Sequence, residues 1–180
     1  MVRLKKTQKE IVSKAKELAV AHEAKYKGCG QCTFMAIIDA LRWGGIELIT
    51  EDEEKKLFPG ISMLTAGVCM TGEGTCGAVS SSAMAIGLAL GVPMGSTDVS
   101  TVHQAAATIR DTLLAKYYKE YGSILCKDVQ RKYFGKAWNL VDDEMTREFL
   151  GITRGCTIMQ TAVCTTEIIL NELEKKNWDR

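Results

Sequence analysis

Cysteine is the residue type with the greatest chemical potential in this chain of 180 residues, which contains seven of them. The N-terminal segment is charged rather than apolar, so we expect a cytoplasmic protein. In a reducing compartment stable disulfides are uncommon, and an odd number of cysteines cannot pair completely. The composition therefore favours metal ligation or reactive thiols over structural disulfides. The cysteines are Cys29, Cys32, Cys69, Cys76, Cys126, Cys156 and Cys164.

Two of the cysteines form a C-x-x-C motif, Cys29-Gly-Gln-Cys32, at the start of a predicted helix. Two thiols at this spacing can close a disulfide or hold one metal ion, and a helix N-terminus lowers the pKa of a thiol. A thioredoxin-like protein is disfavoured because no βαβ pattern surrounds the motif. A zinc ribbon is disfavoured because there is no second C-x-x-C.

A glycine-rich stretch from residue 67 to 77 contains two more cysteines, Cys69 and Cys76. Cys76 is followed directly by Gly77 and Ala78, which open a predicted helix. Glycines allow backbone N–H groups to approach a sulfur closely, and a helix start stabilises negative charge. A phosphate-binding loop is disfavoured because no Gly-Lys-Ser/Thr follows the glycines.

The elements that must position these thiols are predicted to be helices. Thr7 to Glu10 and Thr50 to Glu53 are capping boxes, and the period-two alternation of a strand is hard to find. The sequence predicts an all-α fold, a single helical-bundle domain over residues 1–180, with a central helix of small residues at 78–90. Further helices are expected from the first box to about residue 27, around 34–41, from the second box to about Pro59, from Asp98 or Ser100 to about Tyr121, around Cys126, at 145–150 and at 157–176.

The overall composition excludes several classes of partner. The net charge is +1, and aromatic residues make up 7% of the chain. This balance gives no general attraction to nucleic acid or to an anionic membrane. No uncharged apolar stretch is long enough to span a bilayer. We therefore expect neither nucleic acid nor a membrane among the partners.

The segments Gly74-Thr-Cys-Gly-Ala-Val79 and Ser82-Ala-Met-Ala-Ile-Gly-Leu88 resemble the signature of the C_GCAxxG_C_C family, whose name records a redox expectation. In that family a cysteine opens the first helix, a Cys-Gly-Ala element follows, and two isolated cysteines come later. The resemblance covers nearly the whole chain, from about residue 28 to 174.

The resemblance implies that Cys32, Cys76, Cys126 and Cys164 match the four family positions. A similar helical unit accompanies an iron–sulfur centre in split-Soret cytochromes, and four thiolates are the usual ligands of a [2Fe–2S] or [4Fe–4S] cluster. The resemblance therefore implies an electron-transfer or redox-sensing function, and with it a redox partner protein. The resemblance and the apolar composition also favour a homodimer.

Cys29 and Cys69 are the expected substitutes if one of the four cysteines is not a ligand, whereas the pattern assigns no role to Cys156. Two alternatives remain open at this point. One is a metal-free thiol–disulfide protein that uses Cys29 and Cys32, with Cys69 and Cys76 as a second pair. The other is a structural zinc protein, since thiolates alone do not distinguish zinc from iron. The sequence names no catalytic residue and leaves open whether the chain is an enzyme.

Overall fold

The computed structural model describes residues 4–91, 93–95, 97–152 and 157–175, and this part of the chain is all-α, as the sequence predicts. None of the described helices combines the length and the apolar character needed to cross a bilayer. The elements are, in chain order, α1 (Gln8–Tyr26), α2 (Cys29–Trp43), α3 (Glu51–Ser62), α4 (Gly77–Leu90), α5 (Val99–Thr108), the π-helical turn η1 (Ile109–Leu114), α6 (Ala115–Tyr121), α7 (Cys126–Phe134), α8 (Asp143–Ile152) and α9 (Thr157–Lys175).

Both predicted capping boxes are present. The Thr7 hydroxyl accepts from the N–H of Glu10, and the Glu10 carboxylate accepts from the N–H of Thr7 at 2.8 Å. Thr50 and Glu53 make the same reciprocal pair at the start of α3. Each box satisfies two of the backbone N–H groups that a helix N-terminus leaves unpaired.

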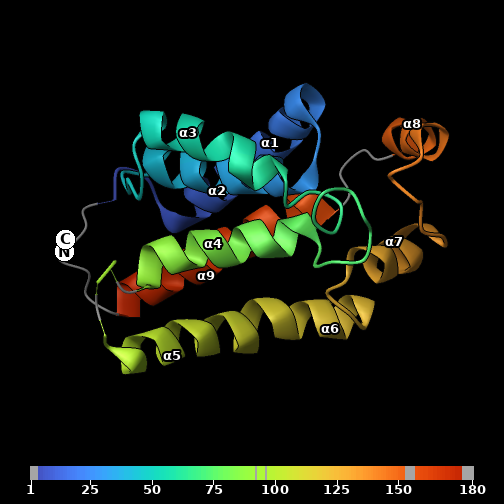
Figure 1. Ribbon diagram of the computed structural model, residues 1–180. Helices are drawn as coiled ribbons and strands as arrows, with labels where there is room; N and C mark the ends of the chain where they lie inside the picture. Colours follow the sequence, from blue (N-terminus) through green and yellow to red (C-terminus); the bar gives the residue numbers. More distant parts are fainter. Residues whose placement is uncertain (1–3, 92, 96, 153–156, 176–180) are drawn as a thin grey trace.

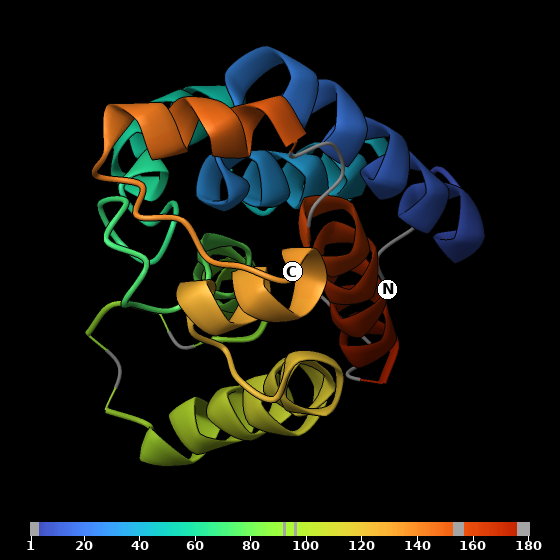
Figure 2. The same cartoon turned by 90° about the vertical axis from the view of Figure 1, so that its right-hand side faces the viewer.

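The main core lies where α2 packs against α1, α4 and α9 (Figure 1). Phe34, Ile37 and Leu41 of α2 are fully buried, as are Ile86 of α4 and Ile169 of α9. The small residues of α4 allow close packing. Helix α4 lies between α2 on one side and the long element formed by α5, η1 and α6 on the other (Figure 1). The end of the molecule that carries α7 and α8 faces the viewer in Figure 2.

One helix boundary and the interior of one helix differ from what the sequence predicts. The helix predicted to end near Pro59 continues to Ser62 with the proline inside it. Proline removes one backbone hydrogen bond and its ring crowds the carbonyl four residues earlier, but α3 continues for only three residues beyond Pro59, so few helical bonds are affected. The long helix predicted from Asp98 to Tyr121 contains the π-helical turn at Ile109–Leu114, for which the sequence carries no clear signal.

Candidate functional site

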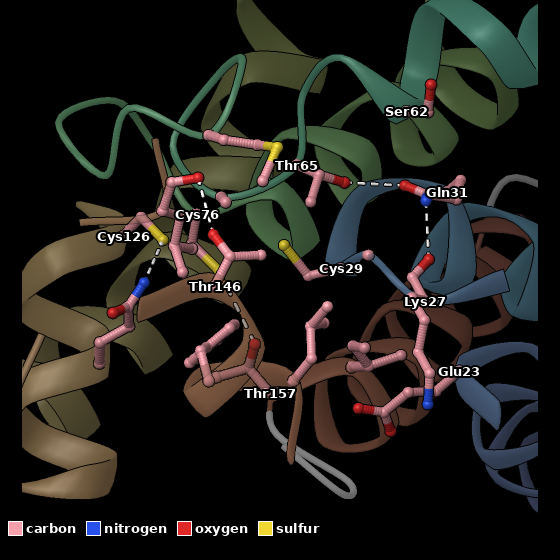
Figure 3. Close-up of a pocket in the computed structure, with 18 of the residues that line it drawn as sticks. Glu23, Lys27, Cys29, Gln31, Ser62, Thr65, Cys76, Cys126, Thr146 and Thr157 are labelled. Carbon is pink, nitrogen blue, oxygen red and sulfur yellow. Dashed lines mark hydrogen bonds between the residues drawn. The ribbon is translucent and has the colours of Figure 1, made fainter. Parts of the chain in front are cut away.

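A cavity of about 480 Å³ lies where several helices begin, and four cysteines line it. Figure 3 labels three of them, Cys29, Cys76 and Cys126. The N-terminal ends of α2, α4, α7 and α9 all contribute to its wall, together with the loop after α3 and the side of α8. The positive ends of the helix dipoles therefore converge on one space, which favours thiolates over thiols there. The four cysteines are Cys29, Cys69, Cys76 and Cys126.

Cys29 and Cys76 are hydrogen-bonded to each other at one end of the cavity. Cys29 is the first residue of α2, and Cys76 is the N-cap of α4. The S–H of Cys76 and the backbone N–H groups of Ala66, Gly77 and Ala78 donate to the Cys29 sulfur. These donors, the Cys76 thiol first among them, outweigh burial and lower the pKa of Cys29 from 9.0 to about 6. Cys29 is therefore a thiolate at neutral pH.

Two glycines permit this close approach of α2 and α4. A Cβ on Gly77 would stand 2.7 Å from the Cys29 sulfur and 2.8 Å from the carbonyl oxygen of Leu64. A Cβ on Gly30 would stand 2.8 Å from the carbonyl oxygen of Ile61. The glycine that follows each of these cysteines therefore makes room for the neighbouring segment.

Cys126, a further cysteine of the cavity, is buried and opens α7. A single antiparallel bridge between Thr75 and Leu125 holds the segments before α4 and α7 side by side. Across this bridge the N–H of Cys76 donates to Ile124 at 2.8 Å, and the N–H of Cys126 donates to Gly74 at 2.9 Å. These backbone bonds fix the starts of the two helices, so Cys76 and Cys126 face the same cavity.

A side-chain amide stabilises the sulfur of Cys126. The Nε2 of Gln130 donates to the Cys126 sulfur at 3.2 Å, and its Oε1 accepts from the backbone N–H of Trp138 at 2.9 Å. Gln130 and Trp138 are themselves buried. The amide therefore ties the thiol to the small second core around Trp138, which also contains Ala66 and Leu140.

Hydroxyl groups connect Cys76 to the interior. The Thr157 hydroxyl, on the first residue of α9, lies 3.7 Å from the Cys76 sulfur. The Tyr117 hydroxyl lies 2.5 Å from that of Thr161 and is also hydrogen-bonded to Thr157. Burial first, and then the repulsion that an ionised Cys76 would exert, raises the pKa of Tyr117 well above its usual value. Tyr117 therefore stays neutral, and its hydroxyl is hydrogen-bonded to both threonines.

The loop between α3 and α4 carries Cys69 in an unusual backbone conformation. Ala66, Val68, Cys69 and Met70 all have positive φ angles, between 51° and 65°, although none is glycine. Such residues are strained, and strain of this kind concentrates at functional sites. The conformation turns the N–H of Ala66 toward Cys29, while Cys69 itself remains exposed.

The structure separates the four cysteines that the family resemblance had assigned as ligands. Cys76 and Cys126 line the cavity, but Cys32 and Cys164 do not. Cys32 points to the end of α1, where its thiol donates to the carbonyl oxygen of Lys27 at 3.0 Å. Burial, followed by the nearby charges of Glu23 and Cys29, raises the pKa of Cys32 to about 12, so it stays protonated.

Cys164 lies along α9 in a separate, much smaller hollow beside Lys116 and Tyr117. Burial raises its pKa. Cys29, named as a substitute, takes the place in the cavity that the sequence had given to Cys32. Cys69, the other substitute, lies at the cavity wall, and Cys156 lies outside the described residues.

Sequence reasoning missed Thr157, Gln130 and Tyr117, which surround the thiols. They are of ordinary residue types and come from helices that only the fold brings to the cavity, so the sequence carries no signal for them. Among the residues described, no three His, Cys, Asp or Glu side chains are placed around a single point as the ligands of one metal ion would be.

The comparisons with known proteins give one family. Residues 27–168 match the family described as "Putative redox-active protein (C_GCAxxG_C_C)", and the chain belongs to this family. Neither the curated proteins nor the solved structures contain a match.

Proposed function

We propose that this member of the C_GCAxxG_C_C family is a thiol redox protein whose working pair is Cys29 and Cys76. The observation that carries the proposal is the hydrogen bond between the two sulfurs, with three backbone N–H groups directed at Cys29. A thiolate is the nucleophile in thiol–disulfide exchange, and its partner thiol must be within reach to complete the reaction. The pair meets both requirements.

The exchange is a two-step transfer of a disulfide. The Cys29 thiolate attacks one sulfur of an oxidised disulfide, forms a mixed disulfide and releases the other sulfur as a thiolate. Cys76 then loses its proton to that thiolate or to solvent and attacks the sulfur of Cys29. The Cys29–Cys76 disulfide forms, the second substrate thiolate leaves, and a substrate disulfide has been reduced to two thiols.

The surrounding groups support the order of these steps. The N–H groups of Ala66, Gly77 and Ala78 stabilise the charge on Cys29 before the attack. The Thr157 hydroxyl lies beside Cys76 and can donate to it when Cys76 in turn becomes a thiolate. The burial of the Cys32 thiol, its raised pKa and its hydrogen bond to the carbonyl oxygen of Lys27 argue against Cys32 as a member of the working pair.

A second candidate is an iron–sulfur centre, favoured by a further thiol, that of Cys126, at the same cavity. For zinc, the described residues offer no group of three or more ligating side chains around one point. A cluster offers separate irons to its ligands, so its thiolates need not converge on one point. Cys29, Cys76 and Cys126 would hold such a cluster, with Cys69 at the wall, and the cluster would supply one-electron transfer.

Metal analysis of the anaerobically purified protein separates the two candidates. The thiol-pair proposal predicts that iron, sulfide and zinc are each far below one per chain, and that mild oxidation consumes one pair of thiols. Replacing Cys76 by serine should abolish that loss, whereas Cys164→Ser, the same change at a partly buried thiol outside the cavity, should preserve it. Iron and sulfide bound in stoichiometric amounts, and lost in Cys76→Ser, would favour the cluster and reject the thiol pair.

A further inference from the structure

The cavity is much larger than a pair of thiols requires. Its volume of about 480 Å³ lies within the range of small-molecule sites, which are mostly apolar with a few well-placed polar groups. The Cys29–Cys76 pair lies at the wall, and Figure 3 shows the open space beside it. Most of the wall is apolar, with Tyr26, Met63, Met70, Phe149, Leu150 and Ile158 among its residues.

Helix α8 forms part of the wall and packs against the second core only in part, through Phe149, whose ring contacts Trp138. Thr146, Phe149 and Leu150 face the cavity, yet no residue of α8 is fully buried. The side chain of Leu150 is 41% exposed although it lines the cavity. An apolar molecule in the cavity would cover this face of the helix, which the protein itself leaves open.

The charges around the cavity do not select an ion. Among the described residues that line it, Glu23 and Lys27 are the only carboxylate and the only ammonium group, and they lie close together at the end of α1 (Figure 3). Their opposite charges largely cancel, and the Cys29 thiolate adds a negative charge that would repel an anion. A neutral ligand is therefore favoured.

We propose that the cavity binds a neutral, apolar organic disulfide and presents one of its sulfurs to Cys29. This inference rests on the proposed function, because it names the class of disulfide that the thiol pair reduces. The apolar groups on both sides of the S–S bond are buried against the cavity wall, and the Cys29 thiolate attacks the nearer sulfur. The atoms balance as in the exchange above: the ligand leaves as two apolar thiols, and Cys29 and Cys76 become a disulfide.

Diphenyl disulfide and bis(2-hydroxyethyl) disulfide provide the test, because both are neutral and only the first is apolar. The rate of mixed-disulfide formation at Cys29 is measured by peptide mass for each probe. It is divided by the rate of the same probe with free N-acetylcysteine, which removes the difference in intrinsic reactivity. Burial of the phenyl groups should give diphenyl disulfide a preference of about tenfold or more in this ratio.

Two variants of α8 locate the effect. Leu150→Asp places a charge in the cavity wall and should remove the preference for diphenyl disulfide. Ile152→Asp introduces the same charge at an exposed position of the same helix that does not line the cavity, and it should retain the preference. At a pH well above the pKa of Cys29, alkylation of Cys29 by iodoacetamide in both variants shows that the thiolate is still present and accessible.

A measurement on the unchanged protein avoids any dependence on the folding of the variants. Bibenzyl has the shape of diphenyl disulfide, with two carbons in place of the sulfurs, and cannot react. It should slow the reaction of Cys29 with diphenyl disulfide competitively and protect Cys29 from iodoacetamide.

The possible outcomes separate this inference from the proposed function. If Cys29 and Cys76 form a disulfide with either probe, but diphenyl disulfide has no preference and bibenzyl does not compete, the apolar ligand is refuted and the thiol pair stands. If Cys29 reacts with neither probe and no Cys29–Cys76 disulfide forms, both proposals are refuted.

Discussion

The sulfur of Cys29 lies 2.7 Å from the position that a Cβ on Gly77 would occupy, so this thiol rests directly on the backbone at the start of α4. The contact brings the N-terminal ends of α2 and α4 together. It also lets the backbone N–H groups of Gly77 and Ala78 reach the sulfur. The Cys76-Gly77-Ala78 element therefore allows the start of α4 to contact the Cys29 thiolate of α2.

The first prediction concerns Gly77. Gly77→Ala would force a methyl group against the Cys29 sulfur and the Leu64 carbonyl, and should lower the free energy of unfolding by about 1–3 kcal/mol. Urea unfolding measures the change. The matched control is Gly87→Ala in the same helix, where no atom lies within 4 Å of the added Cβ. This control should be neutral or stabilise by about 0.4–1 kcal/mol. Equal effects at both positions would contradict the close approach.

The second prediction concerns the ionisation of Cys29. The rate of its alkylation by iodoacetamide should rise with pH around a midpoint of about 6, because the thiolate is the reactive form. Peptide mass analysis follows Cys29 separately from the other cysteines. Cys32, with its pKa raised to about 12, should stay unreactive over the same range. A midpoint for Cys29 near 9 would show that the N–H groups and Cys76 do not stabilise its thiolate.

The same ionisation predicts a dependence of stability on pH. The folded pKa of Cys29, about 6, lies below its ordinary value of 9.0, so the folded state binds the proton less tightly than the unfolded state. The contribution of Cys29 is therefore complete above pH 9 and is lost as the pH falls toward 6. The melting temperature should rise from pH 6 to 9 more steeply in the wild type than in Cys29→Ser. Parallel curves for the two proteins would refute the linkage.

The fourth prediction concerns the amide that joins Cys126 to the second core. Gln130→Leu removes the acceptor of the Trp138 backbone N–H and the donor to the Cys126 sulfur, and should cost about 1–3 kcal/mol of stability. Urea unfolding checks this value against Lys132→Leu, an exposed change in the same helix that should alter stability by less than about 0.5 kcal/mol. A Gln130→Leu protein as stable as its control would mean that the amide is dispensable.

Much of the fold could be predicted from the sequence because its signals are local. Thr7 and Thr50 each carry a complete capping box, and the small residues of 78–90 indicate a helix that packs closely on its neighbours. The interruption at Ile109–Leu114 could not be predicted, since a π-helical turn depends on tertiary packing rather than on a sequence pattern. The end of α3 was predicted near Pro59 but lies at Ser62. The free-energy cost of a proline depends on its position in the helix, which the residue type alone does not give.

The candidate site could be predicted only in part. Cys76 was expected at a helix start and lies there, because its glycine-rich surroundings are a local signal. The choice between Cys29 and Cys32 could not be made from the sequence, since both lie in the first turn of α2 and only the packed neighbours distinguish them. Cys29 meets α4, whereas Cys32 meets the end of α1. Cys164 was expected at the same site but lies in a different hollow. No local sequence pattern indicates which hollow a residue of α9 faces.

The most direct test of the central claim is to identify the disulfide that forms first. The protein is equilibrated with a glutathione redox buffer, the remaining thiols are blocked at low pH, and the peptides are assigned by mass. If Cys29 and Cys76 are the working pair, we expect a Cys29–Cys76 disulfide that is absent from Cys76→Ser and retained in Cys32→Ser. A Cys29–Cys32 disulfide that forms instead, and that persists in Cys76→Ser, would contradict the assignment of Cys76 as the partner of Cys29.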